Sequence, residues 1–261
     1  MNNYYKKDVL NLALYAGELM LINGGETYRV EDVMIRICKV CGVTKAGAFV
    51  SPTSLMLTFD DGNDPGYTYS LQRSIKARDL NLAKVSEINN FSRTFSPEKM
   101  SVEDAMDYLR QIDSSKPYKI PIRIILAGLA TSGFTTASGG RISDMICAFF
   151  IGMIMFWFVE SYALIEKNDF IRTLIASIIA AVLALACGAF GLCSDFNFIL
   201  IGAVYILLPG IAITNAIRDA ISGDLLSGLV RAFEALIIAG SIAIGVGIVL
   251  NIYEIITGGV I

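Results

Sequence analysis

Long apolar runs fill the second half of the chain. A helix that crosses the ~30 Å hydrocarbon core of a bilayer needs about 20 apolar residues. Charged residues lie mainly in the connectors between the runs. The pattern therefore predicts a membrane all-α bundle of about five transmembrane helices within residues 119–261. The predicted spans are 120–138, 145–164, 171–192, 196–214 and 229–250.

The first 118 residues follow a different pattern, which predicts a cytoplasmic α+β domain ahead of the bundle. Val30, Val33, Met34 and Ile37 recur at the spacing of one helix face. Polar residues at helical spacing interrupt the apolar stretch from 9 to 22, which indicates a mostly buried helix rather than a span. The remaining predicted elements are strands at 46–50, 53–59 and 67–71, a hairpin turn at 60–66, and helices at 79–94 and 102–113.

Composition supports this division. The chain is 54% hydrophobic and 17% charged, whereas soluble domains average roughly 45–50% and about 25%. Residues 1–119 hold 15 of the 21 basic and 15 of the 24 acidic residues, so the rest is suited to lipid. A net charge of −3 without a basic block gives no reason to expect nucleic acid as a partner. No signal-peptide cleavage site follows the first apolar stretch.

Basic residues in short loops mark the cytoplasmic side of a membrane protein. If the N-terminus is cytoplasmic, only Arg141 falls on the outer side. The predicted topology is therefore N-terminus inside and C-terminus outside. The basic residues on or near the inner side are Lys116, Lys119, Arg123, Lys167, Arg172, Arg218 and Arg231.

A helix-breaking pair interrupts the fourth predicted span. Pro209-Gly210 falls about 13 residues, or ~20 Å, into it. Transporters use such breaks because freed backbone groups can line a polar cavity, although a simple proline kink is the alternative. Polar residues follow at the inner end of the span, which makes the break a candidate substrate path. These residues are Asn215, Arg218, Asp219 and Asp224.

Three further charged residues are candidates for substrate or proton handling. Arg231 and Glu234 lie three apart on one face of the fifth predicted span and could pair with each other. Asp144, at the start of the second span, could cap that helix or bind protons or cations. The chain has no histidine, so any coupled proton would fall to a carboxylate.

Metal and cofactor chemistry is not indicated. Cys38 and Cys41 form a lone CxxC without a second cysteine pair, and the acidic turn at 60–66 lacks the EF-hand spacing. The five cysteines form no disulfide framework. We therefore expect no metal and no cofactor.

Two long segments resemble the threonine/serine exporter family. They are AGELMLINGGETYRVEDVMIRICKVCGV at 16–43 and LLPGIAITNAIRDAISGDLLSGLVRAFEALIIA at 207–239, together with SPT at 51–53 and GGRISD at 139–144. The chain departs from the family pattern at Arg141. The positions that match the family motifs are Glu26, Thr27, Tyr28, Arg29, Glu31, Asp32, Gly139, Gly140, Asp144, Pro209, Gly210, Asn215, Arg218, Asp219, Gly223 and Asp224.

The resemblance implies export of small metabolites: threonine and serine in some members, and succinate in a related two-component system. Some members fuse two membrane modules, whereas in the split form a larger subunit works with a second, smaller membrane subunit. This chain resembles the larger subunit. The resemblance leaves two roles open for the motif residues from Glu26 to Asp32: they are folding determinants, or they form a docking surface under the pore.

These observations lead to a hypothesis of a secondary exporter in the bacterial plasma membrane, driven by the proton-motive force, with threonine or serine as the favoured substrate. Glu234 or Asp144 would carry the proton, and Arg218 or Arg231 would meet a substrate carboxylate. A dicarboxylate such as succinate is the alternative substrate. A membrane-tethered hydrolase is disfavoured because no nucleophile has a histidine base. A sensor whose soluble half binds a ligand is a further alternative, and the odd number of spans leaves room for a homo-oligomer.

Overall fold

The computed structural model describes residues 3–43, 45–60, 68–76, 79–115, 118–162 and 168–258. The predicted hairpin turn at 60–66 lies outside them, apart from Asp60. The chain folds into two compact units. Unit 1 comprises Met1–Lys116 and Ile213–Ala232, and unit 2 comprises Pro117–Ala212 and Phe233–Ile261. A short segment from the apolar half of the sequence thus folds with the N-terminal half.

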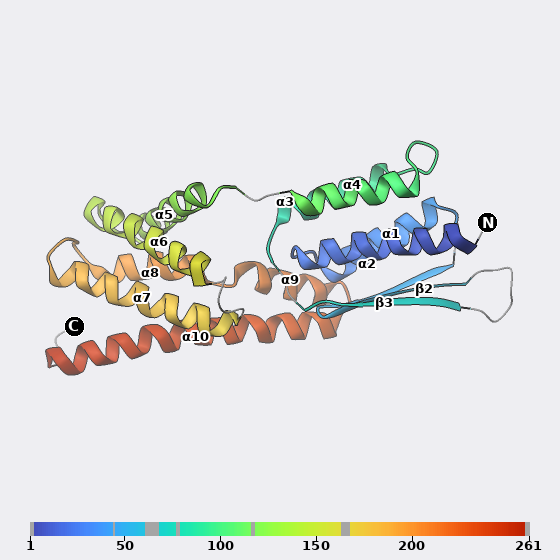
Figure 1. Cartoon of the computed structure of the whole chain (residues 1–261). Coiled ribbons are helices and arrows are strands. Elements are labelled where there is room, and N and C mark those ends of the chain that lie inside the picture. The colour runs from blue at the N-terminus through green and yellow to red at the C-terminus, as the bar shows by residue number, and fades with distance from the viewer. Residues whose placement is uncertain are drawn as a thin grey trace. The chain divides into compact units, whose positions relative to one another are not determined.

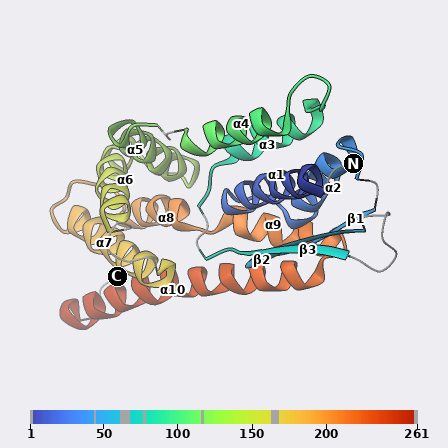
Figure 2. The same ribbon diagram turned by 45° about the vertical axis from the view of Figure 1, so that its right-hand side comes forward.

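Unit 1 contains helices beside a three-stranded antiparallel sheet of order β1-β2-β3 (Figures 1 and 2). The helices and strands predicted from the sequence are confirmed, with boundaries shifted by a few residues. The elements are α1 (Asn3–Ile22), α2 (Thr27–Val40), β1 (Ala46–Ser51), β2 (Ser54–Asp60), β3 (Thr68–Ser74), α3 (Leu82–Thr94) and α4 (Val102–Ser114).

Helix α1 is the centre of unit 1. It packs against α2, α3, α4 and the sheet, and it is buried on most sides, as predicted for the stretch from 9 to 22. The inward residues of β2 alternate along the strand, with Leu55, Leu57 and Phe59 all buried. Helices α1 and α2 approach closely at Gly17 of α1, where an added Cβ would lie 2.5 Å from Met34 Sδ of α2.

The apolar half of the sequence forms six helices within the described residues, as Figure 1 labels them. Four of them are long and apolar enough to cross a membrane, or five spans result if the bent pair α8–α9 counts as one. The prediction of about five spans therefore holds only if α8 and α9 form one broken span, and the count is otherwise four. The helices are α5 (Ile120–Ala137), α6 (Ile142–Tyr162), α7 (Asp169–Ala189), α8 (Phe196–Leu207), α9 (Gly210–Ile221) and α10 (Leu225–Thr257).

Small residues allow the helices of unit 2 to approach closely, which is the usual basis of packing in lipid. A Cβ added at Gly202 of α8 would lie 2.0 Å from Thr135 Oγ1 of α5. One added at Gly152 of α6 would lie 2.2 Å from Thr131 Oγ1. Helix α5 is thus held between α6 and α8 by contacts that only glycine permits.

Candidate functional site

The candidate site begins at the turn between α1 and α2. Gly24 has a φ of +92°, a left-handed conformation that favours glycine. The amide of Gly25 donates to Met20 O at 2.9 Å, which closes the turn. The next helix, α2, starts at Thr27 with Glu26 at its N-cap position. Because the first amides of a helix lack partners within it, the start of α2 needs acceptors from elsewhere.

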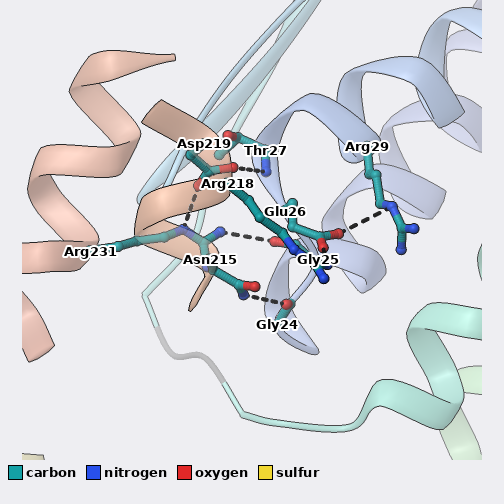
Figure 3. Close-up of polar contacts among 9 residues, drawn as sticks. All are labelled: Gly24, Gly25, Glu26, Thr27, Arg29, Asn215, Arg218, Asp219 and Arg231. Atoms are coloured by element: carbon teal, nitrogen blue, oxygen red, sulfur yellow. Dashed lines mark hydrogen bonds and ion pairs between the residues drawn. The ribbon is translucent and has the colours of Figure 1, made fainter. Parts of the chain in front are cut away.

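Helices α9 and α10 provide partners for this turn, as Figure 3 shows. The amide of Thr27 donates to Asp219 Oδ1 at 3.1 Å. Asn215 Nδ2 donates to Gly24 O at 3.0 Å, and Arg231 Nη2 donates to Gly25 O at 2.9 Å. Side chains from 215–231 therefore satisfy the backbone of a segment almost 200 residues earlier in the chain.

A buried ion pair lies at the centre of these contacts. Arg231 Nε is 3.0 Å from Asp219 Oδ2, and the two side chains are 6% and 0% exposed. The start of α2 carries partial positive charge, which favours a carboxylate beside it. Asp219 thus acts as a helix cap supplied from a distant part of the sequence, and Arg231 balances its charge.

A second, more exposed set of ion pairs surrounds Glu26. Its carboxylate lies 2.5 Å from Arg218 Nη1 and 3.3 Å from Arg29 Nε. The Glu26 side chain is buried, whereas those of Arg218 and Arg29 are 54% and 45% exposed. Salt screens such exposed pairs, so they contribute little stability. Because its side chain is 54% exposed, Arg218 also remains accessible to solvent.

We call these residues the α2 clamp: Gly24, Gly25, Glu26, Thr27, Arg29, Asn215, Arg218, Asp219 and Arg231. All of them belong to unit 1.

The other predicted residues of unit 1 have separate roles. Glu31 Oε1 accepts from the Val50 amide at 3.1 Å and so ties α2 to β1. Burial raises the pKa of Glu31 above its ordinary value, the Val50 hydrogen bond opposes that rise, and the charge of Asp224 adds to it. Asp32 pairs with Arg36 at 2.5 Å on the surface. The carboxylate of Asp224 caps α10 by accepting from the Ser227 amide at 3.2 Å.

The predicted break at Pro209-Gly210 is present. Helix α8 ends at Leu207, α9 begins at Gly210, and the two meet at 50°. Proline has no amide hydrogen, so the α8 ladder cannot continue through Pro209. The other end of α9 is followed by Gly223, which has a φ of +96°. Helix α9 is therefore a separate short helix between two irregular turns.

Asp144 of unit 2 is a fully buried structural anchor. Its carboxylate accepts from the Arg141 amide at 2.8 Å, from the Ser194 amide at 2.6 Å and from Ser194 Oγ at 2.6 Å. A weaker contact at 3.4 Å joins it to the Asp195 amide. Of the two roles considered for Asp144, this geometry corresponds to capping. It joins the turn before α6 to the turn before α8.

Glu234 is half-buried on the part of α10 that belongs to unit 2. The arginine three positions before it, Arg231, belongs to unit 1 and forms an ion pair with Asp219. Sequence reasoning did not identify a pair between Arg123 of α5 and Glu160 of α6, which lie 2.7 Å apart. The signal available was weak, since each is only a charged residue near the end of an apolar run.

No cluster of three or more metal-binding side chains occurs among the residues that the structure describes. Cys38 and Cys41 are free and buried. Burial raises the pKa of the Cys38 thiol to about 12, which disfavours the reactive thiolate.

Sequence reasoning placed most of the clamp side chains on candidate lists but did not predict that they meet. It also missed the carbonyl groups of Gly24 and Gly25 as partners, because backbone atoms leave no trace in a pattern of residue types. A possible signal was the pairing of a charged helix start at 26–32 with complementary charges at 215–231.

Comparison with known proteins adds independent information. A family model described as "ThrE: Putative threonine/serine exporter" matches residues 11–253. The chain is 23% identical over 259 residues to the "Threonine/serine exporter" of Corynebacterium glutamicum, covering 95% of this chain and 52% of that protein. No solved structure matches this chain.

Two other relatives differ in length and source. "Probable succinate transporter subunit YjjP" of Klebsiella aerogenes is 21% identical over 92% of both chains. "Pheromone-regulated membrane protein 10" of Debaryomyces hansenii is 28% identical, covering 89% of this chain and 23% of that protein. The chain thus spans about half of the corynebacterial relative and under a quarter of the yeast one.

Proposed function

Because this chain belongs to the threonine/serine exporter family, we propose that it is a subunit of a secondary exporter of a small polar metabolite, with threonine or serine as substrate and the proton-motive force as energy source. Membership of the family confirms the resemblance seen in the sequence motifs. Family membership and four to five apolar helices also identify a multi-pass membrane protein.

One structural observation carries the proposal beyond the family name: the break between α8 and α9 inside a candidate span. At the end of α8 the Leu208 amide donates to Tyr205 O at 3.4 Å and the Gly210 amide donates to Leu208 O at 2.8 Å, but Pro209 has no amide hydrogen to give to the preceding turn. Irregular backbone in a membrane protein is tolerated where it lines a polar cavity or reaches water. In our proposal the substrate passes this break.

The clamp contacts favour particular residues for the chemistry. Arg231 is buried against Asp219 and Gly25, whereas Arg218 is more than half exposed, so Arg218 is the better candidate to meet a substrate carboxylate. Asp144 already accepts hydrogen bonds from the turn before α6 and from the turn before α8, which suits it to a structural role. Glu234 is therefore the proposed carrier of the coupled proton.

Location and partner also belong to the proposal. The distribution of basic residues supports unit 1 in the cytoplasm of a bacterium and the C-terminal end of α10 outside. Relatives occur in yeasts as well as bacteria, so the host is part of what has to be tested. The Klebsiella relative is named as a subunit, which supports a second, smaller membrane subunit as partner.

The test is efflux from proteoliposomes that contain the chain alone or with a second membrane subunit of the family. Vesicles loaded with labelled threonine should release it faster when a pH gradient is imposed, and Glu234→Gln should abolish that acceleration. Glu254→Gln, on an exposed position of the same helix, is the matched control and should behave as the wild type. Efflux that ignores both the gradient and Glu234→Gln would refute the mechanism.

Succinate is the second candidate substrate, favoured by the match that covers 92% of the Klebsiella succinate transporter subunit. Arg218 and Arg29 lie on either side of Glu26, and two guanidinium groups suit a dicarboxylate as well as an amino acid. Labelled succinate in the same vesicles separates the two. Release of succinate without release of threonine or serine would replace the first substrate by the second.

A further inference from the structure

Helix α9 has two faces of opposite character. Its buried side carries Asn215, Ala216 and Asp219, of which Asn215 and Asp219 bind the turn before α2 and its first residue. Its exposed side carries Ile213, Ile217 and Ile221, spaced four apart, with Ile221 82% exposed. Helix α9 is therefore amphipathic.

Exposed apolar residues also follow Gly223, in the first turns of α10. Leu225, Leu226 and Leu229 are also exposed, at 70%, 61% and 69%. All six residues of this surface, which we call the isoleucine–leucine strip, belong to unit 1. Six large apolar side chains exposed within 17 consecutive residues indicate contact with a partner or a membrane.

Chain continuity identifies the membrane as the occupant. The apolar helix α8 ends three residues before α9 begins. Helix α10 has 33 residues and is ~50 Å long, of which the part from Phe233 onward, ~37 Å, is enough to cross the ~30 Å hydrocarbon core. The strip thus lies between two membrane segments, in the stretch where the chain leaves the bilayer and returns to it.

The polar side of α9 excludes a position deep in the hydrocarbon. Asp219 and Asn215 bind the backbone at Thr27 and Gly24, which belong to a turn between two helices of the polar unit. The neighbouring pairs of Glu26 with Arg218 and Arg29 are partly solvent-exposed. Charged groups of this kind are costly in the bilayer core. They are suited to the headgroup layer, where Arg218 on the flank of α9 can reach water.

We propose that α9 lies in the interfacial layer of the bilayer, roughly parallel to its surface. The isoleucine–leucine strip is buried at the boundary between headgroups and acyl chains, and unit 1 sits on the membrane through the α2 clamp. Helix α9 is then not the inner end of a fourth span. This placement goes beyond the proposed function and holds whatever the chain exports.

The test measures depth at three positions along the strip. The chain has one tryptophan, so Ile213→Trp, Ile217→Trp and Ile221→Trp are each made with Trp157→Phe in the full-length protein in vesicles. Quenching by phospholipids brominated near the headgroup or deep in the acyl chain reports depth, and acrylamide reports exposure to water. Ile244→Trp, on an exposed position of α10 within a candidate span, is the deep control, and Asp107→Trp, on the exposed side of α4, is the aqueous control.

The proposal predicts that all three tryptophans have the same shallow depth to within one helical turn, about 5 Å. They should be quenched most by the bromines near the headgroup and little by acrylamide. A helix that continued the span along the membrane normal would instead give a depth difference of about 12 Å between Ile213 and Ile221, which overturns the proposal. Strong acrylamide quenching, or no quenching by either agent because another protein covers the strip, overturns it equally. None of these outcomes depends on transport activity.

Discussion

Asp219→Ala is expected to destabilise unit 1 more than any surface substitution. The Asp219 carboxylate is fully buried, accepts the first amide of α2 and lies 3.0 Å from Arg231. Removing a helix cap costs about 1 kcal/mol. Removing one partner of a buried ion pair costs about 3–5 kcal/mol, because the other charge stays buried. Arg231 keeps its hydrogen bond to Gly25 O, so we expect a total of about 3–5 kcal/mol.

The assay is thiol labelling of Cys38 in membranes, followed by mass spectrometry of the peptide that contains it. Cys38 lies on α2 and is fully buried, so reagent reaches it only when unit 1 opens. A loss of 3 kcal/mol raises the population of the open form on the order of 100-fold, since 1.4 kcal/mol is tenfold. The labelling rate should rise by that factor when opening and closing are faster than labelling.

Three further variants separate the contributions. Asp219→Asn keeps an oxygen for the Thr27 amide and should cost about 1 kcal/mol less than the alanine variant. The double change Asp219→Leu with Arg231→Met removes both charges and should recover part of the loss. Asp107→Ala breaks an exposed pair with Arg110 and should change labelling by about twofold at most. Labelling of Asp219→Ala within about threefold of the wild type would refute the reasoning, since a 3 kcal/mol loss predicts far more.

Three other predictions follow from the packing and the charges. Gly202→Ala should lower the melting temperature in detergent, with a loss of about 1–3 kcal/mol, because its Cβ would overlap Thr135; Gly133→Ala on α5, which has open space, should not. Asp144→Asn should also lower that temperature, because the amide group cannot accept from the Arg141 and Ser194 donors with both of its ends. Asp195→Asn is the milder comparison, because the Asp195 carboxylate accepts from Asn197 at the start of its own helix. Folding raises the pKa of Glu31 above its ordinary value, so between the ordinary and the folded pKa the folded protein binds more protons than the unfolded chain. The stability of unit 1 should therefore fall as pH rises through that window. Glu31→Gln should flatten this dependence of stability on pH, measured by Cys38 labelling.

Local periodicity was sufficient to predict the helices and strands of unit 1 before residue 116 and the break at Pro209-Gly210. The buried face of α2 contains Val30, Val33, Met34 and Ile37 because side chains three and four apart share one side of a helix. The break followed from the missing amide of a single proline. Both features depend on neighbours in sequence, which a pattern of residues records directly.

The clamp depends on contacts between segments almost 200 residues apart, and local patterns carry no information about such pairing. The same limit explains why Arg231 was considered a partner of Glu234: the two are close in sequence, whereas its pair with Asp219 requires α9 to turn back on α10. The fourth window, 196–214, ended within α9 because averaged hydropathy does not register the polar side of an amphipathic helix. The alternation of Ile213, Ile217 and Ile221 with Asn215 and Asp219 was the available signal.

The most direct test of the account is whether the start of α2 and helix α9 are in contact in the membrane. Glu26→Cys combined with Arg218→Cys places two thiols at positions whose side chains now lie 2.5 Å apart. A short bifunctional thiol reagent applied to native membranes should link them within one chain, whereas the pair Glu103→Cys with Arg218→Cys, whose first residue lies in the first turn of α4, should stay unlinked. Equal linking of both pairs, or of neither, would contradict the account.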